Sequence, residues 1–227
     1  MISGNGYDRF NIWEHSSRVK ELYRKRCRLE EPEMDSARQA VELLAPLARS
    51  GDSLLDAGCG SGYFFHSVQR SGMVIDYAGI DAASCLIKIG HQEMPVYGCR
   101  PDQLTLMRLE DFDARIDHVV CLNVLSNIDN YHRPLERLLL AARKSVILRE
   151  SCWGKPSQYH YVRDEFLDSD VSLKVHVNTY CLSEICDFAR AYGFTAEVVT
   201  DKRTGGRPES VIGYDHHWTF LVFRRTT

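Results

Sequence analysis

The stretch Leu54-Leu55-Asp56-Ala57-Gly58-Cys59-Gly60-Ser61-Gly62 decides the fold of this chain. Apolar residues lead into an acid, and three glycines then alternate with small residues. This pattern predicts a buried strand that ends in a turn lying close to a ligand, because glycine has no Cβ and tolerates positive φ. Residues 63–71 can follow as a helix whose free N–H groups face the turn. We expect the rest of the chain to be arranged around this strand–turn–helix unit.

Length and composition are those of an ordinary globular protein. The chain has 227 residues, of which 44% are hydrophobic and 26% charged, and we expect one domain over residues 1–227. No apolar run approaches the ~20 residues that span a bilayer. The N-terminus lacks the basic and apolar regions of a signal peptide. The sequence therefore predicts no membrane association and a cytoplasmic location.

Charge, cysteines and histidines exclude several classes of partner. The formal net charge of −3 gives no global electrostatic case for nucleic acid. The eight cysteines contain no C-x-x-C pair, so we expect reduced, mostly buried thiols. The nine histidines contain no H-x-x-x-H pair, and we predict no metal ion. The oligomeric state stays open.

Strand and helix patterns alternate along the chain. The expected strands are 53–57, 74–81, 104–109, 117–122, 145–148, 195–200 and 217–224, and the expected helices after the turn are 63–71, 83–93, 134–143 and 181–192. This order predicts an α/β fold with a doubly wound, mostly parallel seven-stranded sheet. The last two strands are joined by a polar turn at 202–213 and predict an antiparallel C-terminal edge strand.

Two segments depart from this alternation. Residues 1–50 predict an N-terminal helical segment, and the basic face of helix 18–28 is either a solvated surface or an anion-binding lid. The alternation of strands and helices stops at Glu150, and residues 151–180 are rich in aromatic residues and histidine. We expect this second segment to be a small insertion over the ligand-binding edge, because parallel sheets bind ligands outside the carboxyl ends of their strands.

The glycine turn differs from two common nucleotide-binding motifs. Tyr63 stands where G-x-G-x-x-G would have its third glycine, and the chain has no G-K-[ST]. A fixed carboxylate at Asp56 would repel a diphosphate and attract a cationic ligand. The turn therefore argues against an NAD site and against a P-loop.

The segment from Leu55 to Gly62 resembles the first motif of class I S-adenosylmethionine-dependent methyltransferases, which have a Rossmann-like fold. Asp81 resembles the acid that ends the second strand in this family, and Glu110-Asp111-Phe112 resembles the acidic site beside the adenine. Asp117 to Leu125 resembles the fourth strand with its substrate edge. Residues 183–194 are similar to the late helix and its turn. The resemblance covers roughly residues 53–150 and 181–225.

The resemblance implies S-adenosyl-L-methionine as the cofactor. Backbone N–H groups of the glycine turn suit its anionic end, and Asp56 suits its ammonium group. Asp81 can accept hydrogen bonds from two ribose hydroxyls, and Asp111 from the adenine amino group. The expected cofactor-binding residues are Asp56, Gly58, Gly60, Asp81, Ala82, Asp111, Phe112 and Asn123.

The sequence indicates less about the methyl acceptor than about the cofactor. A hydroxyl acceptor needs a general base, and a free amine needs one much less. His160 lies in the insertion and His216 at the start of the last strand, so both are candidate catalytic residues. The expected lid and acceptor-side residues are Tyr7, Trp13, Tyr159 and Tyr161.

These observations predict methyl transfer to an oxygen or nitrogen of a small polar or aromatic molecule. The edge after the fourth strand is Asn123-Val124-Leu125-Ser126, which lacks the Pro-Pro motif of amide- and base-N-methylating enzymes. Two alternatives remain: a methyltransferase acting on RNA or protein through the basic helix 18–28, and a non-catalytic S-adenosylmethionine-binding module.

Overall fold

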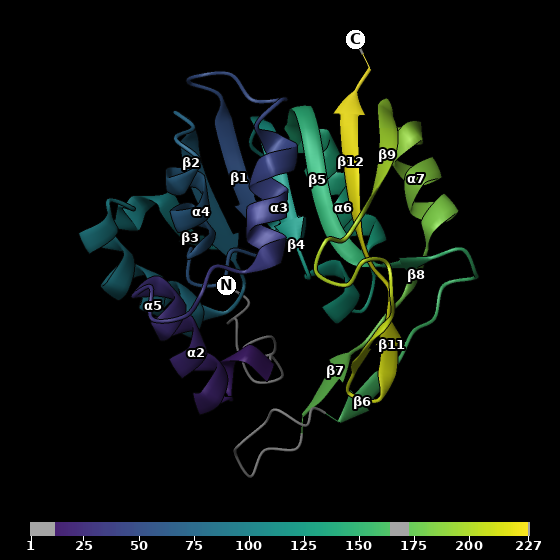
Figure 1. Cartoon of the computed structure of the whole chain (residues 1–227), viewed down its shortest axis with the longest axis horizontal. Helices are drawn as coiled ribbons and strands as arrows, with labels where there is room; N and C mark the ends of the chain where they lie inside the picture. Colours follow the sequence, from purple (N-terminus) through teal and green to yellow (C-terminus); the bar gives the residue numbers. More distant parts are fainter. Residues whose placement is uncertain (1–11, 164–172, 227) are drawn as a thin grey trace.

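A twisted β-sheet runs through the centre of the structure, a computed structural model that describes residues 12–163 and 173–226 (Figure 1). Its main strands are β1 (Ser53–Ala57), β2 (Asp76–Asp81), β3 (Leu104–Leu106), β4 (Ile116–Leu122), β5 (Ala142–Trp153), β9 (Phe194–Thr200) and β12 (Trp218–Arg225). They lie in the order β3-β2-β1-β4-β5-β12-β9. Strands β1 to β5 pair in parallel, and β12 is antiparallel to β5 and β9. The predicted doubly wound, mostly parallel sheet is confirmed.

The C-terminal strand is antiparallel, as predicted, and lies one strand in from the edge of the sheet. β12 is placed between β5 and β9, so β9 is outermost. The apolar composition of β12 explains this order, since Phe220, Leu221 and Phe223 are fully buried. In β9, by contrast, Val198 is half exposed. The strand with more apolar area to bury takes the interior position.

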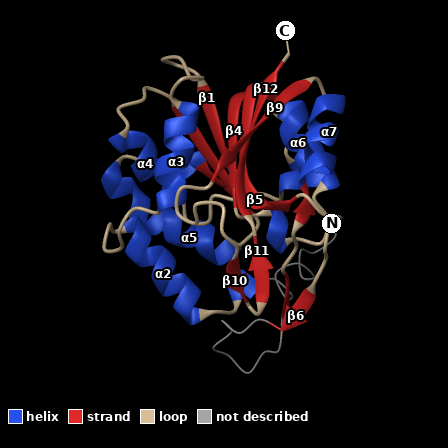
Figure 2. Ribbon diagram, turned by 45° about the vertical axis from the view of Figure 1, so that its right-hand side comes forward, coloured by secondary structure: helices blue, strands red, loops and turns tan. Residues whose placement is uncertain are grey.

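Helices cover both faces of the sheet (Figure 2). The α-helices are α2 (Ser17–Cys27), α3 (Asp35–Leu44), α4 (Phe64–Arg70), α5 (Ser84–Glu93), α6 (His132–Ala141) and α7 (Leu182–Ala191). Short 3-10 helices are η1 (Ile12–Glu14), η2 (Met94–Tyr97), η3 (Pro101–Gln103), η4 (Leu109–Asp111) and η5 (Leu125–Asn127). Buried residues of α3, α4 and α5 share one apolar cluster, and those of α6 and α7 share another. The sheet therefore has one core on each face.

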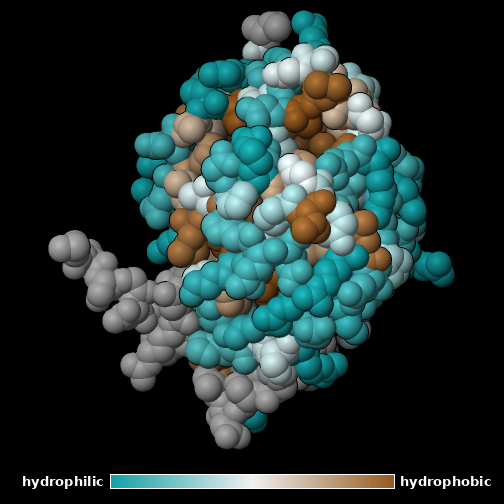
Figure 3. All heavy atoms as spheres, turned by 90° about the vertical axis from the view of Figure 1, so that its left-hand side faces the viewer, coloured by the Kyte–Doolittle hydropathy of each residue, from teal (hydrophilic) through white to brown (hydrophobic). Residues whose placement is uncertain are grey.

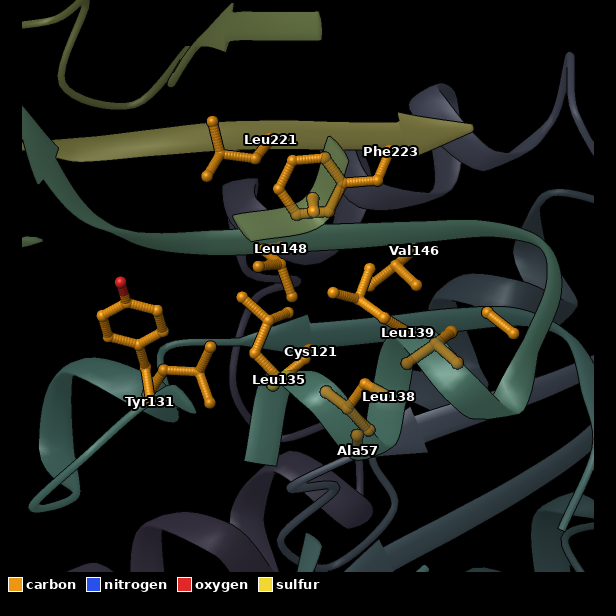
Figure 4. Packing of buried hydrophobic residues seen from close by; sticks show 14 of the residues in the cluster. Ala57, Cys121, Tyr131, Leu135, Leu138, Leu139, Val146, Leu148, Leu221 and Phe223 are labelled. Carbon is orange, nitrogen blue, oxygen red and sulfur yellow. The ribbon is translucent and has the colours of Figure 1, made fainter. Parts of the chain in front are cut away.

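The core on the α6 face shows why this helix forms where it does. Leu135, Leu138 and Leu139 recur at helical spacing, and all three are fully buried. They point towards Val146 and Leu148 of the sheet (Figure 4). Replacing one such leucine by alanine costs about 2–5 kcal/mol.

Strand β5 is longer than predicted. The sequence prediction ended the strand at residue 148 and began the insertion at 151, because two charged residues follow Leu148. In the structure the strand continues to Trp153. Arg149 is paired with Asp201, and Glu150 accepts hydrogen bonds from backbone N–H groups, so both charges stay inside the fold. Residues 151–153 therefore belong to the sheet, and the insertion starts after them.

The insertion and a hairpin extend beyond the carboxyl ends of the strands (Figure 1). In the insertion, β6 (Tyr161–Arg163) pairs with β7 (Lys174–His176), and β8 (Tyr180–Cys181) pairs with the end of β5. The polar turn predicted at 202–213 is wrong in part, because it contains β10 (Glu209–Val211), which pairs with β11 (Tyr214–His216). Tyr214, in β11, packs against an apolar cluster that includes Val175 of the insertion, which supports the extra strand pair.

A polar cluster joins the amino ends of the central strands. His118 of β4 contacts Ser145 Oγ of β5 through Nδ1 at 2.7 Å and Asp52 Oδ2 through Nε2 at 2.9 Å. Lys144 forms ion pairs with Asp52 and Asp117. His118 is fully buried, so its two ring nitrogens are satisfied by protein partners rather than by water. This cluster ties β1, β4 and β5 together at the edge opposite the glycine turn.

None of the helices within residues 12–163 and 173–226 combines the length and apolar character needed to cross a membrane.

Candidate active site

The glycine turn closes the carboxyl end of β1 and packs against the loop that follows β4. Gly58, Gly60 and Gly62 have φ values of 79°, 58° and 78°, in the left-handed region that favours glycine. A Cβ on Gly58 would lie 2.3 Å from Cγ2 of Val124. Any side chain at position 58 would therefore clash as well as strain the backbone. The turn and the loop after β4 form one tightly packed surface.

Asp81 ends β2 and holds the glycine turn. Its carboxylate accepts a hydrogen bond from Gly60 N at 2.8 Å and another from Ala83 N at 2.7 Å. Burial raises the pKa of Asp81, and these backbone donors partly offset that effect. Each carboxylate oxygen has a second lone pair, so Asp81 can accept further bonds from a ligand.

Asp56 is a second acid beside the turn, and it is buried. It is 4% exposed and accepts a hydrogen bond from Tyr77 Oη at 2.7 Å. Burial raises the pKa of Asp56 to about 7; the Tyr77 bond opposes this rise, and nearby Asp81 adds to it. Asp56 lines a cavity of about 30 Å³ together with Gly58, Asn123 and the start of α3. A small cationic group bound in this cavity would lie beside the carboxyl group of Asp56.

Asn123 follows β4 in a strained conformation. Its φ of 59° lies in the left-handed region, which a non-glycine residue rarely adopts. Its N–H donates to Arg149 O at 2.8 Å, and its side-chain oxygen accepts from Arg149 Nη1. The predicted residues Asp56, Gly58, Gly60, Asp81 and Asn123 thus gather at one edge of the sheet.

Glu150 is a buried residue of this edge that the sequence prediction missed. Its Oε1 accepts from Val124 N and Leu125 N, both at 2.9 Å, and its Oε2 accepts from the N–H and hydroxyl of Ser126, both at 2.8 Å. Burial raises the pKa of Glu150, while these four donors lower it. The carboxylate fixes the loop that touches the glycine turn. A charged pair in an apolar strand, Arg149-Glu150, was the available signal.

The N-terminal segment bridges the two sides of the site. The Glu14 carboxylate accepts from Cys85 N at 3.1 and 3.2 Å, and Cys85 Sγ contacts Trp13 O at 3.3 Å, which anchors η1 to α5. Ile12 and Trp13 also pack in an apolar cluster with Val175 of the insertion. Trp13 therefore lies between α5 and the insertion, and its role in a lid stays a prediction. Tyr7, the other expected lid residue, lies outside the described residues.

Helix α2 lies directly on the glycine turn, through residues that are not among the expected site residues. A Cβ on Gly60 would lie 2.2 Å from the Tyr23 ring. Cys27 Sγ is 3.0 Å from Ser61 Oγ. The Arg26 guanidinium lies 5.4 Å and 5.1 Å from the ring centroids of Tyr23 and Tyr63. The outer face over α2, α4 and α5 is mostly hydrophilic with separate hydrophobic patches (Figure 3).

The adenine-side residues are more dispersed than the others. Ala82 is partly buried beside Asp81, and Asp111 is exposed at the end of η4. Phe112 is 9% exposed and belongs to the core on the α6 face. Their proposed contacts with a base remain predictions.

The two candidate catalytic histidines face different surroundings. His160 stacks on Tyr214 at 4.1 Å and lines a cavity of about 290 Å³ together with Trp153 and His217. His216 is buried at 1% exposure and packs at 4.7 Å from the Trp218 ring. Tyr159 and Tyr161, on either side of His160, are more than half exposed. The structure thus does not bring the two histidines into one group with the glycine turn.

The part of the chain that the structure describes holds no group of three His, Cys, Asp or Glu side chains arranged for a metal ion. The expectation of a metal-free site stays a prediction.

A family model described as a methyltransferase domain matches residues 29–199. The chain belongs to this methyltransferase family. The matched region contains the glycine turn, Asp81 and Asn123, and it begins after η1 and α2. No curated protein matches the chain.

Solved structures share the fold of this methyltransferase. Magnesium protoporphyrin IX methyltransferase from Synechocystis PCC 6803, solved with bound SAM, has 17% identity and a TM-score of 0.58, with 98% of this chain and 92% of that chain covered. An S-adenosylmethionine-dependent methyltransferase from Clostridium acetobutylicum has 11% identity and a TM-score of 0.64, covering 92% and 98%.

A third similar structure contains an acceptor as well as a cofactor product. It is the 1,6-didemethyltoxoflavin-N1-methyltransferase of Burkholderia thailandensis, with bound 1,6-didemethyltoxoflavin and S-adenosylhomocysteine. It has 16% identity and a TM-score of 0.56, with 85% of this chain and 80% of that chain covered. The fold of this methyltransferase is therefore that of class I S-adenosylmethionine-dependent methyltransferases.

Proposed function

We propose that this methyltransferase moves a methyl group from S-adenosylmethionine to an oxygen or nitrogen of a small polar or aromatic molecule. The observation that carries the proposal is the glycine turn with an acid on each side, the buried Asp56 on β1 and the partly buried Asp81 on β2. Similar structures hold S-adenosylmethionine or its product, and one of them also holds the small acceptor 1,6-didemethyltoxoflavin.

The residues present fit the chemical groups of this cofactor. The cavity lined by Asp56, Gly58 and Asn123 suits the ammonium end, because Asp56 supplies a carboxylate and the turn leaves room for a ligand. Asp81 retains lone pairs for the ribose hydroxyls. When bound, the cofactor supplies a methyl group on a sulfonium that is already activated. The protein's contribution is then to position the acceptor and exclude water.

The N-terminal segment is suited to exclude water. Trp13 and Glu14 contact the insertion side and α5, and Tyr23 lies on Gly60. We assign η1 and α2 as a lid over the cofactor. The basic surface of α2 and its C-cap is partly neutralised, since Arg24 pairs with Glu21 at 3.6 Å and Arg28, the C-cap, with Glu93 at 2.7 Å. This pairing favours the lid over a nucleic-acid surface and so supports a small acceptor.

Asp81→Asn tests the cofactor site. We expect its affinity for S-adenosylhomocysteine, measured by calorimetry, to fall by one to two orders of magnitude, at about 1.4 kcal/mol per decade. The amide keeps the size of the side chain but loses charge and one acceptor. Asp76→Asn, at the exposed start of the same strand, is the control and should bind normally. Unchanged affinity in Asp81→Asn would contradict the proposed site.

A further inference from the structure

The glycine turn uses its own backbone N–H groups inside the fold. Four of them donate to protein acceptors at 2.8–3.0 Å, those of Gly58, Cys59, Gly60 and Gly62. The acceptors are the carbonyl oxygens of Ile80 and Cys59 and the carboxylate of Asp81. Ser61, the remaining residue of the turn, is fully buried. Each N–H has one hydrogen to donate, so the carboxylate of the cofactor, expected at these N–H groups, needs another donor.

The Asn123 side chain has a fixed orientation at the same edge of the sheet. Its Oδ1 accepts a hydrogen bond from Arg149 Nη1. A guanidinium can only donate, so the amide turns its oxygen towards Arg149 and its NH2 group away from it. The Asn123 backbone is bonded as well, since its N–H donates to Arg149 O and its carbonyl accepts from Asn127 Nδ2, both at 2.8 Å. The Asn123 NH2 group has no partner among the described residues.

Arg149 is itself held by other parts of the fold. It is 2% exposed, its Nε donates to the fully buried Asp201 at 2.7 Å, and its guanidinium lies 4.4 Å from the centroid of the Trp218 ring. Asp201 balances the charge of the guanidinium, which a buried arginine requires. Arg149 is therefore a rigid support for the Asn123 amide.

Asn123 and Asp56 line the same cavity at the end of β1. One supplies an NH2 donor and the other a carboxylate. The ammonium and the carboxylate of an α-amino acid are attached to one carbon atom, so an ammonium beside Asp56 brings its carboxylate close to the Asn123 NH2 group. A hydrogen bond to an ionised acceptor is stronger than one between neutral groups. The two side chains therefore match both charges of a zwitterion.

We infer that the Asn123 NH2 group, oriented by Arg149, binds the carboxylate of the cofactor. Asn123 is then a binding residue, and Arg149 is a positioning residue that acts through Asn123. This inference rests on the proposed function, because it assigns one end of that cofactor. It goes further by placing the carboxylate on the loop after β4 and not on the backbone of the glycine turn.

S-Adenosyl-3-thiopropylamine, which is S-adenosylhomocysteine without its carboxylate, tests the assignment by calorimetry. The natural chain should bind S-adenosylhomocysteine about tenfold or more tightly than this amine. In Asn123→Asp the affinity for S-adenosylhomocysteine should fall by about the same factor, whereas the affinity for the amine should stay or rise. The aspartate can still accept from Arg149 and tolerates the φ of 59° at this position.

Asn130→Asp is the matched control for the change of charge. Asn130 is exposed, and its Oδ1 accepts from His132 N, which an aspartate also allows. This variant should keep both affinities. An equal fall of both affinities in Asn123→Asp would indicate a structural role and overturn the inference, as would an unchanged affinity for S-adenosylhomocysteine.

Arg149→Lys tests the positioning role. Lysine keeps the charge opposite Asp201 but lacks the fork that also holds Asn123. The preference for S-adenosylhomocysteine over the amine should fall several-fold, and Arg149→Lys added to Asn123→Asp should lower it no further. An unchanged preference in Arg149→Lys would show that Arg149 does not position the amide.

His118→Phe separates positioning from stability. His118 is buried at the opposite end of the strands, with both ring nitrogens bonded. The variant should lower the midpoint of thermal unfolding, because it leaves buried partners unpaired, and should keep the ligand preference. An equal loss of preference in His118→Phe and Arg149→Lys would overturn the positioning role.

The two proposals fail in different ways. If the natural chain does not bind S-adenosylhomocysteine, the proposed function is wrong. If it binds S-adenosylhomocysteine and the amine equally well, the assignment of the carboxylate to Asn123 alone is wrong.

Discussion

At the scale of single residues, the burial of Asp56 affects how strongly its carboxyl can bind a cationic ligand group. Its carboxyl lies beside the cavity at the end of β1, and burial raises the pKa of Asp56 to about 7. A cationic ligand group favours the ionised form, so binding should be stronger where that form is already present. This makes the affinity for the cofactor product dependent on pH.

We expect affinity for S-adenosylhomocysteine to rise about tenfold between pH 6 and pH 8, since the ionised fraction of a group with a pKa of about 7 rises by that factor. Calorimetry at several pH values measures this change. Asp56→Asn should bind weakly and without the rise, and Asp76→Asn should keep it. A flat profile in the natural chain would mean that Asp56 does not face the ammonium group.

Residue roles could be predicted from the sequence where the residues stand in a motif at a strand end. The glycine spacing and the acids at Asp56 and Asp81 are such signals, and the structure places them together. Glu150 and Tyr23 stand in no such motif, and their partners Ser126 and Gly60 belong to other elements. Hydrophobic periodicity carries no information about such pairings. The roles of His160 and His216 stay predictions for the same reason.

At the scale of elements, we propose that η1 and α2 form one covering unit. They touch the glycine turn through Tyr23 and Cys27, α5 through Glu14, and the insertion side through Ile12. These contacts are few compared with those of the sheet, so local opening of this unit should cost less than global unfolding. A ligand bound beneath it would oppose the opening.

Limited trypsin digestion tests this coupling. Saturating S-adenosylhomocysteine should slow cleavage after Lys25 and Arg26 of α2 several-fold, measured by mass spectrometry over a time course. Cleavage after Lys202 and Arg203, in the exposed connection between β9 and β10, should keep its rate. Equal protection of both regions, or none in α2, would contradict the lid.

Element boundaries were predictable where the apolar pattern alone sets them. β1 and α6 follow their sequence patterns, because one face of each is buried in the core. β5 extends past the predicted end because Arg149 and Glu150 have buried partners in other elements. The strands β10 and β11 lie in a segment whose polar, glycine-containing sequence predicts only a turn.

At the scale of the whole molecule, the carboxyl ends and the amino ends of the strands differ in what they contribute. We call them the carboxyl edge and the amino edge. The carboxyl edge holds Asn123, whose backbone has a positive φ, and Arg149, whose Nη2 has no partner among the described residues. The amino edge holds the bonded cluster of His118, Asp52 and Lys144. Strain at a binding edge is sustained by stability elsewhere in the fold. Changes at the amino edge should therefore affect stability and leave ligand affinity unchanged.

Asp52→Asn tests this separation. Burial acts to raise the pKa of Asp52, but hydrogen bonds from Lys144, the Arg49 backbone and His118 together lower it. A lowered folded-state pKa contributes stability above the unfolded pKa of about 4 and loses it as pH falls below that value. We expect the variant to lose about 1–3 kcal/mol at pH 7, and less at pH 3, in urea unfolding.

This experiment has two controls, the ligand affinity of the same variant and the unfolding of a variant at an exposed acid. S-adenosylhomocysteine affinity should be unchanged in Asp52→Asn, and Asp113→Asn should unfold like the natural chain at both pH values. A loss of stability as large at pH 3 as at pH 7 would show that the Asp52 charge is not what stabilises this edge.

The cluster at the amino edge has the residue types of a hydrolase catalytic triad. Ser145, His118 and Asp52 form a hydrogen-bonded serine–histidine–aspartate chain, the constellation that peptidases and esterases use to generate a nucleophile. Here the serine is 1% exposed and the histidine fully buried, and the order of the ring nitrogens is the reverse of that in chymotrypsin-like enzymes. A template search on three side chains would match this place, whereas acyl transfer also requires an approach path for a carbonyl to Ser145 Oγ. We expect the chain to be inert towards fluorophosphonate reagents at Ser145.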